Sequence, residues 1–304
     1  MTDVLSRLRE ACAEVASRSR SVAIDRGAIA EYAATLPLGS AAHEPDPSGE
    51  TRDHRAAFWL TLDAINFGSG WSGTLRKAPG RSGYATTAAG VAERLESRGP
   101  WSAAELAAIG SDELAGVFGQ DAGHELMALF ATSLNDFGNH LSAEYGGSFT
   151  ALVDSFGGSV VALVTELAGW ECFADTSTYD GLTLPFLKRA QIAAADLARA
   201  GVWDPADLDR LTMFADNLVP HVLRLDGILR FDPELVARID REELIVHGSP
   251  EEVEIRACAV EAVELIVAAR PGSGTADVDQ TLWLRGQGPR YKASPRHRSR
   301  STAY

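Results

Sequence analysis

The sequence contains no hydrophobic run long enough to cross a membrane. A membrane-spanning helix needs about 20 consecutive apolar residues, and no stretch of the 304 residues approaches this length. The N-terminal segment, MTDVLSRLREACAEVASRSR, alternates charged and apolar residues and lacks the apolar core of a signal peptide. We therefore expect a soluble protein that is located in the cytoplasm and has no membrane partner.

Cysteine is scarce, and the potential metal ligands show no characteristic spacing. Cys12, Cys172 and Cys258 lie far apart and form neither a zinc motif nor a disulfide framework. The seven histidines also lack metal-ligand spacing. We expect three buried free thiols.

The familiar short catalytic motifs are absent as well. There is no G-x-x-x-x-G-K-[ST], no H-E-x-x-H and no G-x-S-x-G. The GSGWSG stretch does not lie between a strand and a helix, so it is not a dinucleotide fingerprint. The sequence therefore gives no sign of a P-loop nucleotide-binding protein, a zinc metalloprotease or an α/β-hydrolase.

The net charge of −14 argues against a nucleic-acid polymer as partner, because such binding depends on neutralising phosphates. A single nucleotide needs only a local basic patch, and residues 281–304 provide one without any acidic residue. The basic side chains of this segment are Arg285, Arg290, Lys292, Arg296, His297, Arg298 and Arg300. Composition alone favours a disordered tail here.

What the sequence does contain is mostly helical pattern. Hydrophobic residues make up 45% of the chain, and apolar positions recur at spacings of three and four. Strand signals are few and no strand–helix alternation is present. The pattern predicts a mainly α fold with few short strands. It also predicts one domain over residues 1–304, which could consist of two helical lobes around one pocket.

Local signals predict where several helices and loops lie. Ser249 as N-cap, Pro250 at the first helical position and Glu252 as partner in a capping box predict a helix that ends near Arg270. Ser102 and Ser111 predict two further helix starts. Polar residues 38–56 and 272–277 predict loops.

The stretch TLDAINFGSGWSG, residues 61–73, combines groups that suit a small-molecule pocket. Asp63 and Asn66 interrupt an apolar run, where polar groups need partners. Phe67 and Trp71 flank a glycine-rich break, although a surface loop has no need of large aromatic side chains. Aromatic walls with a few polar groups are typical of ligand pockets.

The segment LTLPFLKRAQIAAADLARAG predicts a helix from about Pro185 to Gly201. Lys188 and Arg189 then fall in its first turn, where the helix dipole disfavours cations unless a negative group is present. A bound phosphate is one such group. A carboxylate from elsewhere, for instance Asp175 or Asp180, is the alternative.

Two further charged residues lie among apolar neighbours. Asp216 lies in LTMFADNLVPHVL, where Pro220 is expected to end or bend the helix. Such a carboxylate is either a partnered structural group or a site residue with a shifted pKa. Arg256 falls within an apolar helical stripe one turn after Glu252, so we interpret it as a structural brace with a buried partner.

In chain order, these stretches resemble the queuosine salvage protein family, the queuosine 5'-phosphate N-glycosylase/hydrolases. The resemblance spans about residues 58–304. The segments that carry it are DAINF, RSGY, YGGSF, FADTSTYDG, FLKRAQI, LTMFADNLVPHVL, EEVEIRACAVEAVEL and the closing PRHRSRSTAY.

The resemblance implies a helical fold related to helix-hairpin-helix DNA glycosylases. It also implies hydrolysis of the N-glycosidic bond of queuosine 5'-phosphate, which releases queuine for reuse in tRNA, without a metal or organic cofactor. The implied catalytic residues are Asp216, facing the sugar, and Asp175 as second choice or as the group that orients the base. The implied substrate-binding residues are Asp63, Asn66, Phe67, Trp71, Tyr84, Phe214, His221, Lys188, Arg189, His297 and Arg298. Of these, the aromatic residues Phe67, Trp71 and Tyr84 would stack on the deazapurine, Asn66 would read its edge, and Lys188, His297 and Arg298 would hold the 5'-phosphate.

Two segments differ from the family pattern. NFGSGW stands where members often have Asn-Phe-Cys-Phe-Trp, and His221 replaces a glutamine. Gly68 and Gly70 predict a roomier pocket beside Trp71 that accepts a wider range of 7-deazapurine nucleotides. A non-catalytic binding protein for a modified nucleotide and a helical scaffold without ligand are the competing hypotheses. The resemblance also predicts that the basic C-terminal segment is ordered.

Overall fold

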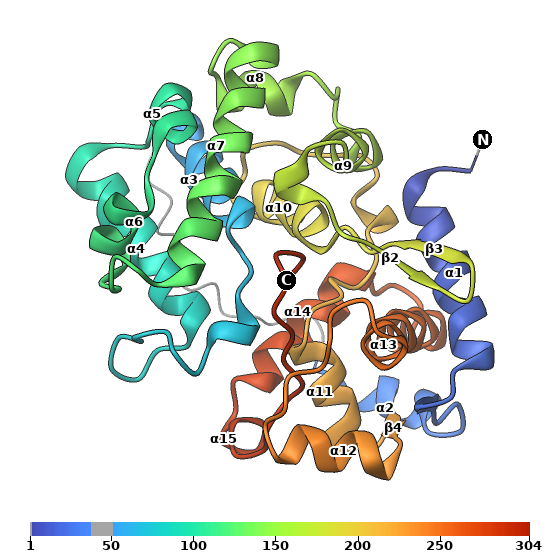
Figure 1. Cartoon of the computed structure of the whole chain (residues 1–304). Helices are drawn as coiled ribbons and strands as arrows, with labels where there is room; N and C mark the ends of the chain where they lie inside the picture. The colour runs from blue at the N-terminus through green and yellow to red at the C-terminus, as the bar shows by residue number, and fades with distance from the viewer. Residues whose placement is uncertain (1, 38–50) are drawn as a thin grey trace.

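The computed structural model of the protein describes residues 2–37 and 51–304, and it is mainly helical (Figure 1). Within these residues the strands form two antiparallel pairs, β1 (Val22–Ile24) with β4 (Leu229–Phe231) and β2 (Thr176–Tyr179) with β3 (Leu182–Pro185). The predicted mainly α class with few short strands is confirmed. The relation to helix-hairpin-helix glycosylases stays a prediction.

The helices pack into two hydrophobic clusters. The first cluster is built on α3 to α10 and the second on α1, α2 and α11 to α14. The longer helices are α1 (Val4–Arg18), α3 (Arg52–Ala64), α4 (Gly83–Arg98), α7 (Glu125–Tyr145), α10 (Lys188–Arg199), α13 (Pro250–Ala269) and α14 (Thr275–Gly286). The shorter ones are α2 (Ile29–Thr35), α5 (Ala103–Ala108), α6 (Ser111–Phe118), α8 (Phe149–Asp154), α9 (Val160–Leu167), α11 (Leu218–Leu225), α12 (Pro233–Asp240) and α15 (Pro289–Lys292), with the 3-10 turns η1 (Ser69–Trp71), η2 (Glu171–Phe173) and η3 (Leu208–Arg210). The division into one domain or two lobes stays a prediction.

Helix α13 matches its sequence signals at both ends. Ser249 caps the first turn by accepting a hydrogen bond from the Glu252 backbone N–H, and the helix ends at Ala269. The Glu252 side chain, however, accepts from the Gly248 N–H at 3.0 Å and contacts His247, so the capping box that we expected with Ser249 does not form.

Three helix starts differ from the predictions. Helix α10 begins at Lys188 rather than near Pro185, because residues 182–185 pair with β2 as a strand. Helix α14 begins at Thr275, inside the expected loop 272–277. Helix α3 begins at Arg52, inside the expected loop 38–56, of which residues 38–50 lie outside the described part of the chain.

Of the two serines that predicted helix starts, Ser102 is the N-cap of its helix, whereas Ser111 lies one residue inside its helix. Ser102 caps α5 in a complete capping box with Glu105, as expected. Ser111 is the first helical residue of α6, and Gly110 is the cap. Cys12, Cys172 and Cys258 are buried free thiols, as predicted. None of the described helices is long and apolar enough to span a membrane.

The basic C-terminal segment is ordered, and from α15 at the lower edge of the view it runs to a buried chain end at the middle (Figure 1). Asn217 donates to the backbone oxygen of His297 at 3.0 Å, and the Ile245 N–H donates to that of Arg298 at 2.9 Å. The backbone oxygen of Tyr304 accepts from the Gly68 N–H at 3.3 Å. The expectation of an ordered segment is therefore confirmed, and the disordered tail that composition favoured is wrong.

Candidate active site

Asp216 lies at the one partly exposed position in a buried stretch. Residues 211–215 and 217–223 are buried, whereas Asp216 is half-buried. Its Oδ1 accepts from the backbone N–H groups of Leu218 (2.8 Å) and Val219 (3.2 Å) at the start of α11. Among the described residues, none donates a hydrogen bond to its Oδ2. The carboxylate is thus fixed through one oxygen by a helix N-terminus, which stabilises negative charge, and keeps the other oxygen available.

We expected Pro220 to end or bend this helix, but the helix continues past it to Leu225. Pro220 is the third residue of α11. The first-turn N–H groups of a helix have no intrahelical acceptor, so a proline there costs no hydrogen bond. The helix begins at Leu218 with Asn217 as the N-cap residue, so that Asp216, one residue earlier, accepts from the first two N–H groups of the helix.

Lys188 lies beside Asp216 and is matched by carboxylates. Its Nζ donates to the backbone oxygen of Asn66 at 2.9 Å, and the side chain is buried. Burial lowers the pKa of the Lys188 ammonium, while the carboxylates of Asp216 and Asp63 act to raise it. Carboxylates that act on this cation are thus present in the structure, and a bound phosphate stays a prediction.

Asp63 is fully buried on α3 and has one unsatisfied oxygen. Its Oδ1 accepts from Asn66 Nδ2 at 3.2 Å, and Oδ2 has no hydrogen-bond partner within the described residues. Burial raises the pKa of Asp63 well above its usual value, and the Asp196 carboxylate raises it further. A buried carboxyl in this state favours the protonated form and retains unused hydrogen-bonding capacity.

Asp279 on α14 is a candidate that sequence reasoning missed. Its side chain is 4% exposed, and its Oδ1 accepts from the Phe214 N–H at 3.0 Å. Burial, and then the Asp216 carboxylate, raise the pKa of Asp279 well above its usual value. The available signal was an aspartate between Val278 and Leu282 on the apolar side of a helix, but the expected loop at 272–277 obscured that helix.

Arg256 has the buried partner that the sequence analysis required. Its guanidinium forms a two-point contact with Asp175, from Nη1 to Oδ1 at 2.9 Å and from Nη2 to Oδ2 at 2.6 Å. Glu252 Oε1 lies 3.7 Å from Nη1, at the predicted spacing of one helical turn. Both oxygens of Asp175 are therefore engaged. This geometry suits a positioning role for Asp175 better than contact with a substrate.

Arg189 is held inside the first hydrophobic cluster. It is 1% exposed, donates to the backbone oxygen of Ala64 at 2.5 Å and lies over the Phe67 ring at 5.0 Å. Phe67 in turn packs edge-to-face on Phe130. Arg189 and Phe67 thus lie together; Arg189 is buried and is not a free binding group, whereas Phe67 is half-buried.

The glycines beside Trp71 do not create extra space. A Cβ on Gly68 would lie 2.9 Å from the Leu126 side chain, and one on Gly70 would lie 2.5 Å from the backbone oxygen of Ser299. The expectation of a roomier pocket is therefore wrong, because the Leu126 side chain fills the volume beside Gly68 and the C-terminal segment fills the volume beside Gly70. Trp71 is 4% exposed and donates through Nε1 to Glu125 at 2.7 Å.

The remaining predicted binding residues lie in different environments. Tyr84 on α4 is half-buried and packs edge-to-face on Trp283 of α14, with ring centroids 6.0 Å apart. Phe214 is buried two residues before Asp216. Arg298 is paired with Glu242 at 2.9 Å and lies 3.3 Å from the Ser72 hydroxyl.

The two predicted histidines are neutral groups. Burial lowers the pKa of His221 to about 4 and that of His297 to about 3. His221 Nε2 donates to the backbone oxygen of Tyr291 at 2.9 Å. A neutral imidazole brings no positive charge of its own, and the role of His297 in holding the 5'-phosphate stays a prediction. Arg296, which the prediction omitted, is an exposed residue, but burial of its guanidinium lowers its pKa, while the Asp216 carboxylate acts to raise it.

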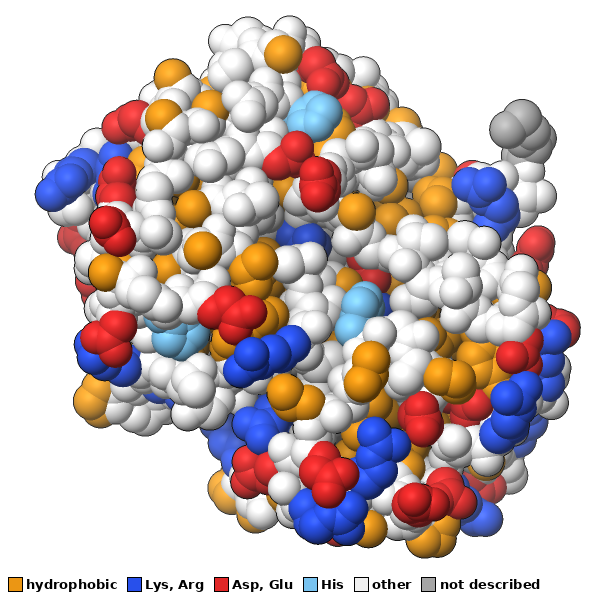
Figure 2. Space-filling model, viewed as in Figure 1, with side chains coloured by type: hydrophobic (Ala, Val, Ile, Leu, Met, Phe, Trp, Pro, Cys, Tyr) orange, Lys and Arg blue, Asp and Glu red, His pale blue; other side chains and the backbone are white. Residues whose placement is uncertain are grey.

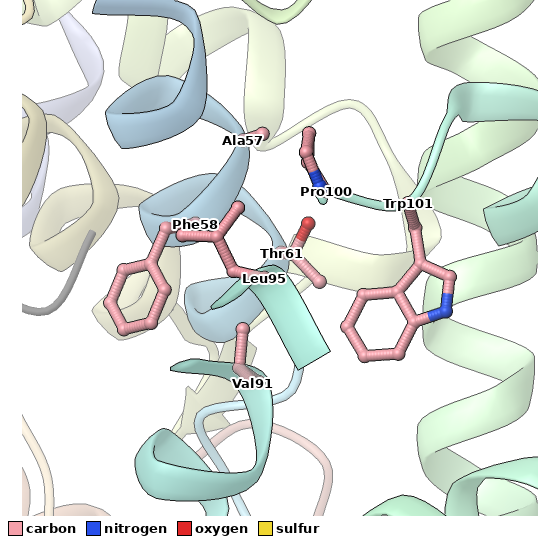
Figure 3. A pocket seen from close by; sticks show the side chains of 7 residues that line it. All are labelled: Ala57, Phe58, Thr61, Val91, Leu95, Pro100 and Trp101. Carbon is pink, nitrogen blue, oxygen red and sulfur yellow. The ribbon is translucent and has the colours of Figure 1, made fainter. Parts of the chain in front are cut away.

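The charged centre and the small cavity between α3 and α4 are separate features. Figure 2 shows a recess at the middle of one face, in which acidic and basic side chains lie below the surface near the C-terminal residues of Figure 1. The cavity of Figure 3 lies between α3 and α4 and measures about 10 Å³, room for no more than one water. Its lining residues are Ala57, Phe58, Thr61, Val91, Leu95, Pro100 and Trp101, none of which is a predicted site residue.

A family model described as queuosine salvage protein matches residues 45–304, most of the chain. The chain belongs to the queuosine salvage protein family. A relative from Sphaerobacter thermophilus, named queuosine 5'-phosphate N-glycosylase/hydrolase, is 35% identical over 95% of each chain. Relatives of the same name from Bos taurus (31% identical, 87% of this chain and 84% of theirs) and Mus musculus (30%, 85% and 83%) extend the queuosine salvage family match to mammals.

Proposed function

We propose that this protein hydrolyses the N-glycosidic bond of queuosine 5'-phosphate, or of a related 7-deazapurine nucleotide, and releases queuine for salvage into tRNA. The observation that carries the proposal is the match to queuosine 5'-phosphate N-glycosylase/hydrolases over nearly the whole chain. The substrate is a mononucleotide, in keeping with the net charge of −14, and the reaction takes place in the cytoplasm.

Asp216 is the carboxylate that faces the sugar. Cleavage of a glycosidic bond passes through a state in which positive charge develops on the sugar ring, and a nearby fixed carboxylate stabilises it. Asp216 is half-buried and is oriented by two backbone N–H groups. These contacts hold Oδ1 in place, so that Oδ2 is directed to the substrate without reorganisation during the reaction.

Asp279 is the proton donor for the departing base. A leaving base gains from a proton, and a carboxyl with a raised pKa is suited to supply it. Burial and the Asp216 charge both favour the protonated form of Asp279. Asp216 and Asp279 are thus two interacting carboxyl groups with different exposure. This arrangement separates the roles of charge stabilisation and proton donation.

Different residues near Asp216 recognise the base and the 5'-phosphate of the nucleotide. Asn66 and Asp63, which share a hydrogen bond, offer polar groups for the base edge, and Phe67 lies next to them. Arg296 is the cation for the 5'-phosphate, because it is exposed near Asp216 and, among the described residues, forms no ion pair with a carboxylate within 4 Å.

The test is release of free base from queuosine 5'-phosphate by the purified protein, followed by chromatography. Stabilisation of the protein by the nucleotide without any base release would instead support the non-catalytic binding protein. Neither stabilisation nor release would support the scaffold hypothesis.

A further inference from the structure

Arg256 joins two separate parts of the candidate site. It lies in the second turn of α13 and is fully buried. Its Nε donates to the backbone oxygen of Ala215 at 2.8 Å, while its two terminal nitrogens donate to the two carboxylate oxygens of Asp175. One guanidinium therefore bonds to the segment that carries Asp216 and to the segment that leads into α10.

The Asp175 end of this connection determines where Lys188 lies. Asp175 Oδ2 also accepts from the Lys188 N–H at 3.0 Å, and its backbone oxygen accepts from the Leu187 N–H at 3.2 Å. Leu187 has φ = 51°, a left-handed conformation that a leucine adopts only when its surroundings impose it. Asp175 supplies that constraint and so fixes the first turn of α10.

The guanidinium itself has little freedom to move. It lies between the rings of Phe186 and Tyr304, 4.0 and 4.6 Å from their centroids. The planar fork of arginine fits a carboxylate at two points, which a lysine ammonium does not reproduce. A cation that served only to neutralise Asp175 would not need the additional hydrogen bond from Arg256 Nε to the backbone oxygen of Ala215.

We propose that Arg256 is a positioning residue of the reaction, which holds Asp216 and Lys188 in register through Ala215 and Asp175. This inference rests on the proposed hydrolysis at Asp216. Its consequence is that the site depends on the shape of the Arg256–Asp175 contact and not only on its charge. Displacements of about 1 Å at a catalytic group lower rates by roughly a hundredfold.

The experiment compares Arg256→Lys, which keeps the charge but loses the fork, with Glu254→Gln. Glu254 is an equally buried charged residue on α13, and it bonds to the backbone N–H groups of Ser21 and Val22 and to the Tyr179 hydroxyl. It therefore anchors β1 and serves as the matched structural control. Thermal unfolding and steady-state kinetics are measured for both variants at a temperature where both are folded.

We expect Arg256→Lys to lower kcat for base release at least 30-fold while KM changes less than threefold. Glu254→Gln should lower the unfolding temperature but leave kcat within twofold of wild type. A kcat for Arg256→Lys within threefold of wild type would overturn the positioning role. If Arg256→Lys does not fold, Asp175→Glu is measured in its place, because it keeps the ion pair but shifts the carboxylate by one methylene. An unchanged kcat in Asp175→Glu would overturn the inference, and a tenfold loss of kcat would support it. Absence of base release by the wild type itself would instead contradict the proposed function.

Discussion

Asp216→Asn removes one negative charge while keeping the shape of the side chain. The asparagine Oδ1 can still accept from the Leu218 and Val219 N–H groups, so the cap of α11 is retained. The substitution therefore tests the charge at this position with little change in packing. We expect the folded protein to bind the nucleotide and to release base slowly.

The size of the effect follows from the charge that is lost. A carboxylate about 4 Å from a developing positive charge, at the effective dielectric of a partly exposed site, contributes about 4 kcal/mol. Because each 1.36 kcal/mol changes a rate about tenfold, complete loss corresponds to roughly a thousandfold. The amide dipole recovers part of this, so we expect a decrease in kcat of roughly 100- to 1,000-fold.

Single-turnover release of base from queuosine 5'-phosphate is the assay, with nucleotide affinity measured in parallel. Asp207→Asn is the control, because Asp207 also caps a helix by accepting from the Val160 N–H (2.6 Å) at the start of α9. Both variants should lose similar stability, but only Asp216→Asn should lose the chemical step. A single-turnover rate for Asp216→Asn within threefold of wild type would refute the assignment.

Three further predictions concern the C-terminal segment and its contacts. Gly70→Ala should destabilise the protein by roughly 1–3 kcal/mol, since its Cβ meets rigid backbone, whereas Gly116→Ala, with open space at its Cβ, should not; equal melting temperatures would contradict the close approach. The native pKa of His221 (about 4) is below its unfolded value of 6.5, so the unfolded state binds more protons between these values and stability should fall as the pH drops from 6.5 to 4. In His221→Gln, the free energy of unfolding should fall by on the order of 3 kcal/mol less over this pH range than in the wild type. If chemical denaturation gives the same pH profile for both proteins, the buried imidazole is not neutral. Arg296→Ala should raise KM about tenfold for the 5'-phosphate and little for the nucleoside, with Lys292→Ala as control; an equal effect on both substrates would exclude phosphate contact.

Features encoded by neighbouring residues were predictable from the sequence. The boundaries of α13 follow from Ser249, Pro250 and Pro271, which act within one turn of the helix ends. The need of Arg256 for a buried partner followed from its apolar neighbours. The identity of that partner did not, because Asp175 is 81 residues away in the chain.

Features that depend on contacts between distant segments were the ones that the sequence did not reveal. Gly70 suggested open space, yet the backbone of Ser299 and Arg300 occupies it. The start of α10 shifted from Pro185 to Lys188 because strand pairing overrides helical pattern there. Asp279 became a candidate only once its proximity to Asp216 was known.

The measurement that tests the central claim most directly is the reaction of the wild-type protein with queuosine 5'-phosphate, with base and ribose 5-phosphate quantified together. Hydrolysis of the N-glycosidic bond predicts that the two products appear in equal amounts and in many turnovers per protein molecule. The absence of free base, under conditions where the nucleotide demonstrably stabilises the protein, would contradict it.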